Sequence, residues 1–423
     1  MFSIGVEKDC TAKIHPHPIS TAQNSVALPS LYTHLLEFEP RSTSTIFGGD
    51  EELGKNIVVC CDGTGNQFAV DQTNVLRLHY SLVIDAQRQV AFYEPGVGTF
   101  SPNMALTRPG KAFSKVLGLA FGAGYRKTIE DAYWFIVENY QPGDRICLFG
   151  FSRGAYAARV VAALLHAVGI LQQGNRHLVQ YALSEIELRK GVSLDFAHLG
   201  RFRKQFSQSF DQKPFIFLGL WDTVSSVSWA YDYLSYAFTA SNPSVDVVRH
   251  AVSIDEHRAF FSQNLFKRRQ HQDFKEVWFA GVHSDIGGGY PEDESGLAKI
   301  ALEWMLVQAR DVGGVLLDDS RVKRVLVEGS GPSHAGPIHR SLTWKWWWAE
   351  FFPKQSYPSP VPLPHLFRRR KPTTRSLDQS DVKSCRIHES TVRRNSDTQV
   401  NYKPSNWPKE FEVEPQSRYE FES

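Results

Sequence analysis

The chain has 423 residues, of which 42% are hydrophobic, 13% aromatic and 22% charged. This composition is typical of a globular protein with a sizeable core and excludes a disordered chain. The formal net charge is only +2, so the charge balance predicts neither nucleic acid nor an anionic membrane as a partner. The length allows one large α/β domain with additions, or two domains.

The five cysteines are scattered and form no CxxC pair. A cysteine-rich zinc site is therefore not expected, and we predict no metal and no other cofactor. The odd number of cysteines suits a reducing compartment. The N-terminus has no basic segment followed by an apolar one, and no apolar run is long enough to cross a bilayer. We expect a cytoplasmic protein, and the sequence indicates no oligomeric state.

Three regions differ in their patterning. Residues 1–54 show no sustained periodicity, and we interpret them as a poorly ordered N-terminal flank. In residues 55–320, apolar runs alternate with helical patterns, which predicts a mainly parallel sheet with helices on both faces. Residues 321–423 are interpreted as an irregular C-terminal extension, with an aromatic segment at 341–353 followed by a polar tail.

The expected elements follow from the period of the apolar residues. Buried strands are predicted, in chain order, at 56–61, 90–93, 146–149, 215–221 and 274–280. Helices are predicted at 74–83, 125–139, 155–165, within 172–212, at 247–261 and at 295–310. The aromatic insertion at 225–245 is interpreted as a lid.

The rest of the chain is organised around Gly150-Phe-Ser152-Arg-Gly154, between an apolar strand and an alanine-rich helix. The turn between them must be sharp, and a Cβ at Gly150 or Gly154 would collide with neighbouring backbone. Gly-x-Ser-x-Gly in this setting predicts the nucleophile elbow of an α/β-hydrolase, with Ser152 at its apex. The alternative is an ordinary glycine-rich turn.

A serine needs a base, usually a histidine that is held by a carboxylate. In this fold the acid and then the histidine follow the serine in the chain, and all three stand at the carboxyl ends of strands. Asp222 directly follows the strand 215–221, and His283 follows the strand predicted at 274–280. We therefore predict a Ser152, Asp222, His283 triad. The alternative for His283 is a structural histidine in a glycine-rich loop.

Two other acids remain candidates. Asp285 lies two residues after His283, where it could cap the turn formed by residues 287–289. Asp255 falls in the helix predicted at 247–261, where we expect it to face solvent. Asp222 is preferred because the end of a strand fixes a side chain better than a helix face or a loop does.

An oxyanion needs at least two N–H donors aimed at it. We expect one from the backbone of Arg153, directly after the serine, and one from Gly63 or Thr64 in the loop that follows the first strand. Asp62 is expected to hold this loop by hydrogen bonds. A phosphate-binding loop is set aside because neither the P-loop nor the GxGxxG pattern is present.

Five separate segments of the sequence resemble those of a known family. They are Val58-Val-Cys-Cys-Asp-Gly-Thr-Gly-Asn66, Tyr93-Glu-Pro-Gly-Val-Gly98, Gly150-Phe-Ser-Arg-Gly-Ala155, Leu220-Trp-Asp-Thr-Val224 and Trp278-Phe-Ala-Gly-Val-His-Ser-Asp-Ile-Gly-Gly-Gly-Tyr290. In this order they are similar to the uncharacterised α/β-hydrolase domain that many fungal proteins share with bacterial type VI secretion phospholipase effectors. The similarity covers about residues 55–310.

The resemblance implies a Ser-Asp-His esterase that deacylates phospholipids. It assigns the nucleophile to Ser152 and the base to His283, and it supports Asp222 as the acid. We expect this chain to lack the large C-terminal membrane-binding region of the effectors. The resemblance therefore implies ester hydrolysis without fixing phospholipid as the substrate.

The segment 341–353 contains four tryptophans and two phenylalanines and is followed by an arginine-rich stretch. One interpretation is a peripheral membrane contact. The other, which we favour, is that these aromatics pack on the hydrolase domain or line an acyl pocket. We thus expect a serine hydrolase of carboxylic esters, with lipid or phospholipid esters among the substrates. The alternatives are an inactive hydrolase fold that binds a partner, and a thioesterase or peptidase.

Overall fold

The computed structural model describes residues 54–63, 72–96, 111–188, 193–224, 235–258, 261–342, 375, 377 and 385–421. All of these residues belong to one unit, which spans residues 40–423. The flank predicted at 1–54 lies outside the described residues except for Gly54. Residues 225–234 of the aromatic insertion and residues 343–353 of the aromatic segment also lie outside them.

Within the described residues, eight strands form a single sheet in the order β2-β1-β3-β4-β5-β6-β7-β8. All seven neighbouring pairs are parallel. The strands are β1 (Asn56–Cys61), β2 (Gln89–Glu94), β3 (Arg145–Phe151), β4 (Phe215–Trp221), β5 (Val247–Ser253), β6 (Asp273–Phe279), β7 (Cys385–His388) and β8 (Phe411–Glu414).

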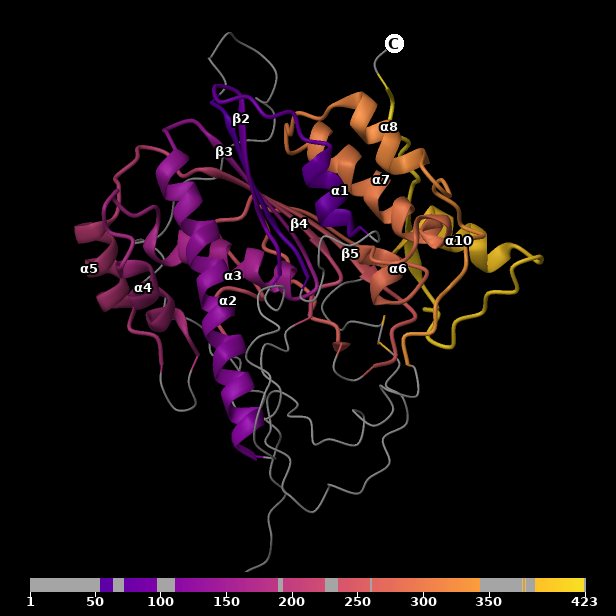
Figure 1. Ribbon diagram of the computed structural model, residues 1–423, viewed down its shortest axis with the longest axis horizontal. Coiled ribbons are helices and arrows are strands. Elements are labelled where there is room, and N and C mark those ends of the chain that lie inside the picture. Colours follow the sequence, from indigo (N-terminus) through magenta and orange to yellow (C-terminus); the bar gives the residue numbers. More distant parts are fainter. Residues whose placement is uncertain are drawn as a thin grey trace, which may run out of the picture. The chain divides into compact units, whose positions relative to one another are not determined.

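Helices cover both faces of this sheet (Figure 1). They are α1 (Asn74–Tyr80), α2 (Lys111–Asn139), α3 (Arg153–Val168), α4 (Leu178–Ile186), α5 (Phe196–Phe206), α6 (His283–Gly287), the 3₁₀ turn η3 (Glu292–Glu294), α7 (Gly296–Asp311), α8 (Asp319–Val327) and α10 (Glu389–Ser396). Within the part of the chain that the structure describes, no helix is long and apolar enough to cross a membrane. The parallel α/β architecture predicted from the sequence is confirmed.

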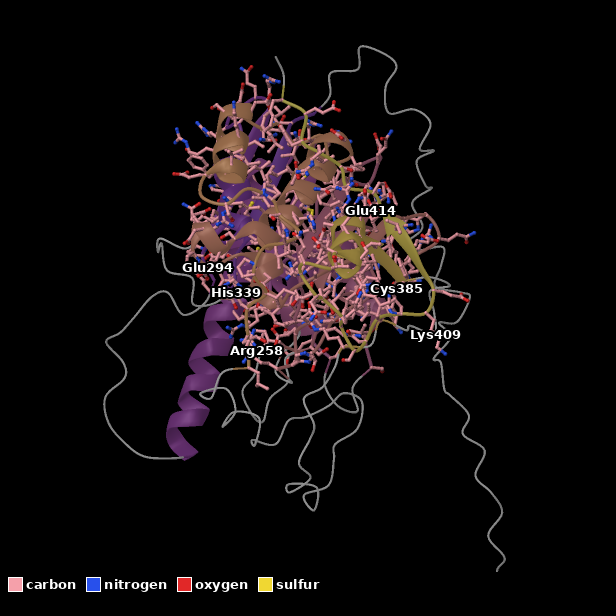
Figure 2. All side chains as sticks on the ribbon, turned by 90° about the vertical axis from the view of Figure 1, so that its right-hand side faces the viewer. Arg258, Glu294, His339, Cys385, Lys409 and Glu414 are labelled. Atoms are coloured by element: carbon pink, nitrogen blue, oxygen red, sulfur yellow. The ribbon has the colours of Figure 1, made fainter. Side chains whose placement is uncertain are left out.

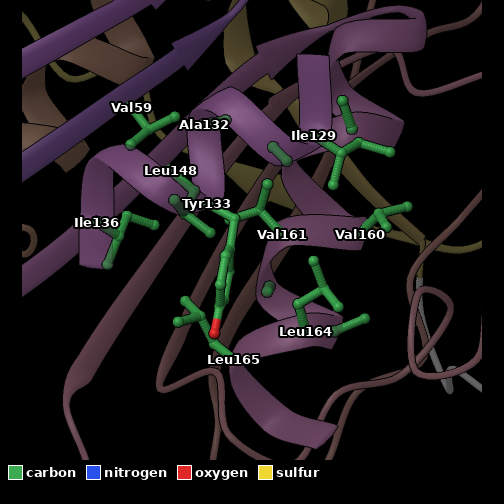
Figure 3. Packing of buried hydrophobic residues seen from close by; sticks show 14 of the residues in the cluster. Val59, Ile129, Ala132, Tyr133, Ile136, Leu148, Val160, Val161, Leu164 and Leu165 are labelled. Atoms are coloured by element: carbon green, nitrogen blue, oxygen red, sulfur yellow. The ribbon is translucent and has the colours of Figure 1, made fainter. Parts of the chain in front are cut away.

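One face of the sheet packs against α2, α3, α4 and α5. Val59 of β1 and Leu148 of β3 point to this side, as Figure 3 shows, and contact the buried faces of α2 and α3. Every residue of α3 after Arg153 is buried. This explains its alanine-rich sequence, because small side chains let a helix surrounded by protein approach its neighbours closely.

The next residue along each of these strands faces the opposite side, as the period of a strand requires. Val58 and Cys60 of β1 and Phe149 of β3 pack with α1, α7 and α8. The sheet therefore lies between two apolar layers. This is why its central strands are apolar throughout instead of alternating with polar residues.

The segment 247–261 is not the predicted helix: residues Val247–Ser253 form β5, between β4 and β6. Its two basic residues, Arg249 and His250, are buried and bind side chains of neighbouring elements. Arg249 binds Asp273 and Gln308, and Nδ1 of His250 lies 2.8 Å from Oε2 of Glu276. Its apolar residues at 247, 248, 251 and 252 fit a helical period as well as a buried strand, which led to the wrong prediction.

The start of one further helix differs from the prediction. Helix α2 begins at Lys111, well before the predicted residue 125, and includes a glycine-rich stretch. A single glycine costs a helix about 1 kcal/mol but does not end it. Helix α7 agrees closely with the prediction at 295–310.

The last part of the chain adds strands to the sheet. β7 pairs with β6, and β8 pairs with β7, with α10 between them in the sequence. Cys385 of β7 and Glu414 of β8 lie on the same side of the molecule in Figure 2. The sequence pattern did not indicate these elements, because both strands have only four residues and contain charged side chains.

Candidate active site

Ser152, Asp222 and His283 lie at one edge of the sheet. Ser152 follows the last residue of β3, Asp222 follows the last residue of β4, and His283 begins α6 shortly after β6. Because all the strands are parallel, their carboxyl ends meet at the same edge. Three residues that are far apart in the sequence therefore come together.

The turn at Ser152 is tight. This residue has φ 59° and ψ −123°, a conformation that costs a non-glycine residue energy and is found mainly at functional sites. Its N–H donates to the carbonyl oxygen of Trp221 at 3.0 Å. A Cβ on Gly150 would lie 2.5 Å from the carbonyl oxygen of Gly154. The predicted steric reason for glycine at this position is confirmed.

The three side chains form a continuous series of contacts. Nε2 of His283 lies 2.9 Å from Oγ of Ser152, and Nδ1 lies 2.5 Å from Oδ2 of Asp222. All three residues are buried. An ionised Asp222 can only accept a hydrogen bond, so Nδ1 carries the imidazole proton. The lone pair of Nε2 is then directed at the serine hydroxyl.

The carboxylate of Asp222 is held on both oxygens. Oδ1 accepts the N–H of Ser253 at 2.9 Å, and Arg375 donates to Oδ1 at 2.5 Å and to Oδ2 at 3.0 Å. Burial alone would raise the pKa of Asp222, but Arg375 and the hydrogen bond from His283 outweigh it and hold this pKa well below its usual value. Asp222 is therefore ionised at neutral pH.

The imidazole of His283 lies between two aromatic rings. Phe151 and Phe261 have centroids 4.6 Å and 4.7 Å from it. The backbone N–H of His283 donates to Oε2 of Glu256 at 3.2 Å. Burial lowers the pKa of His283 below its ordinary value, although Asp222 acts in the opposite direction. His283 is therefore neutral, and able to accept a proton, at neutral pH.

Two of the three residues predicted to supply oxyanion donors can be located. Arg153 is the first residue of α3 and directly follows Ser152. The N–H of Gly63 donates to Oδ1 of its neighbour Asp62 at 2.6 Å. Thr64 lies outside the described residues. The predicted role of Asp62 in holding the loop is confirmed, because Oδ2 also accepts the hydroxyls of Thr73 and Tyr93, each at 2.6 Å.

The alternative acids have other partners. Oδ2 of Asp285 accepts the N–H of Val282 at 3.0 Å, and Oδ1 lies 2.6 Å from Nδ1 of His339. Asp285 thus caps the start of α6 and not the turn at 287–289. The prediction that Asp255 lies on a helix and faces solvent is wrong, because Asp255 follows β5 and has partners within the protein. Its Oδ2 accepts the N–H of Gly281 at 2.7 Å and the hydroxyl of Tyr402 at 2.8 Å.

Sequence reasoning missed Arg375 and Glu256, which contact Asp222 and His283. Arg375 falls in a stretch that was interpreted as part of a polar tail. Glu256 was assigned to a helix that does not exist. No local pattern marks either residue, because their roles depend on contacts between distant parts of the chain. Among the described residues, no group of three or more His, Cys, Asp or Glu side chains is placed to hold a metal ion.

The parallel sheet, its covering helices and the position of the site define an α/β-hydrolase-like protein. The chain belongs to the family described as T6SS, Phospholipase effector Tle1-like, catalytic domain, which matches residues 55–308. The family expected from the five sequence blocks is thereby confirmed. Membership supports lipid ester hydrolysis as the general class of activity.

The chain is also similar to three individual proteins. It is 34% identical over 239 residues to Uncharacterized protein YEL023C of Saccharomyces cerevisiae, a match that covers 52% of this chain and 35% of the yeast protein. It is similar to the crystal structure of an uncharacterized protein from Pseudomonas aeruginosa, with 20% identity and a TM-score of 0.39, over 66% of this chain and 49% of that one.

The third is the Tle1 effector, solved bound to the VgrG spike from the Type 6 secretion system. It shows 21% identity and a TM-score of 0.33, over 58% of this chain and 53% of the effector chain. This chain thus matches about a third of the yeast protein and about half of each solved chain.

Proposed function

We propose that this protein is a serine hydrolase that cleaves carboxylic esters of lipids through an acyl-enzyme. The observation that carries the proposal is the continuous series of contacts from Ser152 through His283 to Asp222. A serine, a neutral histidine and an ionised carboxylate in this order are the groups that acyl transfer needs. Family membership supports a lipid as the source of the ester.

In the first half of the reaction, Oγ of Ser152 attacks the ester carbonyl carbon, and its proton passes to Nε2 of His283. Asp222 stabilises the imidazolium that forms. The tetrahedral intermediate then collapses, the bond to the alcohol breaks, and His283 gives its proton to the leaving alcohol oxygen. The acyl group is left as an ester on Ser152.

In the second half, His283 takes a proton from water, and the resulting hydroxide attacks the acyl carbon. The proton returns from His283 to Ser152 as the carboxylic acid leaves. We assign one oxyanion donor to the N–H of Arg153 and the second to the loop at residues 63–64. If Gly63 is this second donor, its N–H must release the Asp62 carboxylate and donate to the oxyanion instead.

The test compares wild type with Ser152→Ala in two measurements: labelling by a fluorophosphonate probe, and hydrolysis of a short-chain aryl ester. Ser184→Ala is the matched control, because Ser184 lies on α4, outside the candidate site, and its hydroxyl donates to the carbonyl oxygen of Tyr181 in its own turn. We expect wild type and the control to react and Ser152→Ala to be inert. Equal labelling of all three proteins would end the proposal, and no labelling of any would favour an inactive binding fold.

A second panel tests the substrate class with phospholipid vesicles, a triacylglycerol emulsion, an acyl thioester and a peptide amide. Release of fatty acid from either lipid by wild type, but not by Ser152→Ala, is the expected result. Turnover of the thioester or the amide without any release from lipid would replace the lipid esterase by a thioesterase or a peptidase.

A further inference from the structure

Arg375 comes from a part of the chain beyond the family match at residues 55–308, yet it lies beside the candidate triad. It is buried, and both terminal nitrogens of its guanidinium contact Asp222, Nη1 at 2.5 Å from Oδ1 and Nη2 at 3.0 Å from Oδ2. An arginine that binds both oxygens of a carboxylate fixes its rotation as well as its position.

The guanidinium is itself held in place. Nη1 donates to Oγ and to the carbonyl oxygen of Ser253, at 2.6 Å and 3.1 Å, and Nη2 donates to the carbonyl oxygen of Phe261 at 2.7 Å. Arg375 therefore ties the end of β5 and the residue whose ring lies against His283 to the same carboxylate.

The backbone around Arg375 is anchored to the body of the protein. Its carbonyl oxygen accepts the side-chain amide of Asn406 at 3.0 Å, and the same amide donates to the carbonyl oxygen of Ile254 at 3.2 Å. Leu377, two residues later, is buried in an apolar cluster with Val252 and Trp278. Residues 375 and 377 are thereby held beside the C-terminal end of β5.

We propose that Arg375 is a positioning residue of the hydrolase: it holds the Asp222 carboxylate in the rotation that binds His283. The inference rests on the proposed function, because it assigns Arg375 a role in that same reaction. It also adds a residue from beyond the matched catalytic domain to the site.

The alternative is that Arg375 only compensates the charge of a buried carboxylate, as any buried acid requires. The two roles differ in the effect that removing Arg375 has on the protonation of His283. The charged groups that face His283 are Asp222 and Glu256, which favour its protonation, and Arg258, which opposes it. Arg375 offsets the charge of Asp222, so removing it increases the proton affinity of the pair, whichever of the two takes up the proton.

The experiment measures kcat and KM against pH for wild type, Arg375→Met and Arg375→Lys with a short-chain aryl ester. For Arg375→Met we expect a kcat about 10–100-fold lower and an acidic midpoint of kcat/KM that is higher by about 0.5–1 pH unit. Arg375→Lys keeps the positive charge but loses the bidentate contact with both oxygens of Asp222. Its midpoint should stay near that of wild type while kcat remains reduced.

Arg394→Met is the matched control. Arg394 is another buried arginine of the C-terminal part, and its Nη1 donates to backbone carbonyl oxygens, including that of Gly336 at 2.7 Å. We expect this variant to lose stability without moving the midpoint. Circular dichroism checks that each variant is folded, and Arg375→Lys carries the test if Arg375→Met does not fold.

The outcomes separate the two proposals. If wild type hydrolyses the ester through Ser152 but Arg375→Met has an unmoved midpoint, or Arg375→Lys moves it as far as Met does, the role of Arg375 is wrong and the hydrolase stands. If wild type shows no hydrolysis that depends on Ser152, both proposals are overturned.

Discussion

The backbone of Gly154 lies directly against the carbonyl oxygen of Cys61. A Cβ built on Gly154 would overlap this oxygen and also the carbonyl oxygen of Asp62. The first turn of α3 therefore runs against the end of β1, at a distance that only glycine allows. This contact sets Ser152 beside the loop that begins at Asp62, where the second oxyanion donor is expected.

Gly154→Ala should damage this arrangement. The methyl group has to push α3 away from β1, so we expect the free energy of unfolding to fall by about 1–3 kcal/mol, as for other overpacked sites. We expect labelling of Ser152 by a fluorophosphonate to slow by about 100-fold or more, because a displacement of about 1 Å can cost that much. Urea unfolding and the labelling rate measure the two effects.

Gly200→Ala is the control for this substitution. Gly200 lies in α5, and nothing within 4 Å would meet an added Cβ. Alanine favours a helix over glycine, so this variant should be as stable as wild type or more stable by up to about 1 kcal/mol. If Gly154→Ala behaves in the same way, the close packing of Gly154 on Cys61 does not control the site.

The choice of acid can be tested by three asparagine variants. Asp222→Asn should lower kcat by about 10³–10⁴-fold, because a neutral amide no longer holds the proton on Nδ1 of His283. Asp285→Asn and Asp255→Asn should each lower it by less than about 10-fold, since neither carboxylate contacts the imidazole in the structure. A larger loss for Asp285→Asn than for Asp222→Asn would reassign the acid.

The pH dependence follows from the burial of His283. Its pKa lies below the ordinary value of 6.5 because burial disfavours the imidazolium more than Asp222 stabilises it. The base must be neutral to act, so kcat/KM should rise with pH through a midpoint below 6.5 and be level at neutral pH. An initial-rate profile with an aryl ester checks this. A midpoint above about pH 7 would contradict the expected protonation of His283.

The sequence predicted the part of the site that depends on strand ends. Ser152, Asp222 and His283 each follow an apolar strand, and parallel strands bring such positions together whatever their separation in the chain. The steric need for glycine at position 150 could also be predicted, because it arises within a few residues. The three side chains then meet because β3, β4 and β6 lie near one another in the sheet.

The remainder depended on contacts between distant segments. β5 was predicted as a helix because Arg249 and His250 look like a solvent-facing side, whereas both are buried and bind Asp273 and Glu276 of the neighbouring strand. Arg375 could not be found for the same reason. A buried ion pair leaves no periodic signal, and its two members are 153 residues apart.

The last prediction concerns His339, which links the chain beyond α8 to the helix that begins with His283. Nδ1 lies 2.6 Å from Oδ1 of Asp285, Nε2 lies 2.9 Å from Oε2 of Glu294, and the ring stacks on Tyr290. Glu294 and His339 are neighbours in Figure 2. Burial alone would lower the pKa of His339, but the hydrogen bonds to Glu294 and Asp285 outweigh it and raise this pKa above its ordinary value.

A raised pKa in the folded state means that protonation of His339 stabilises the fold. This contribution is complete below the pKa of the unfolded chain and is lost as the pH rises through the higher folded pKa. His339→Gln should therefore lower the free energy of unfolding by about 1–2 kcal/mol near pH 5.5 and by less near pH 8. His334→Gln is the control, because the imidazole of His334 makes a longer contact, 3.4 Å, with Asp397. Urea unfolding at both pH values measures the difference, and a loss for His339→Gln that grows with pH would contradict a raised pKa for His339.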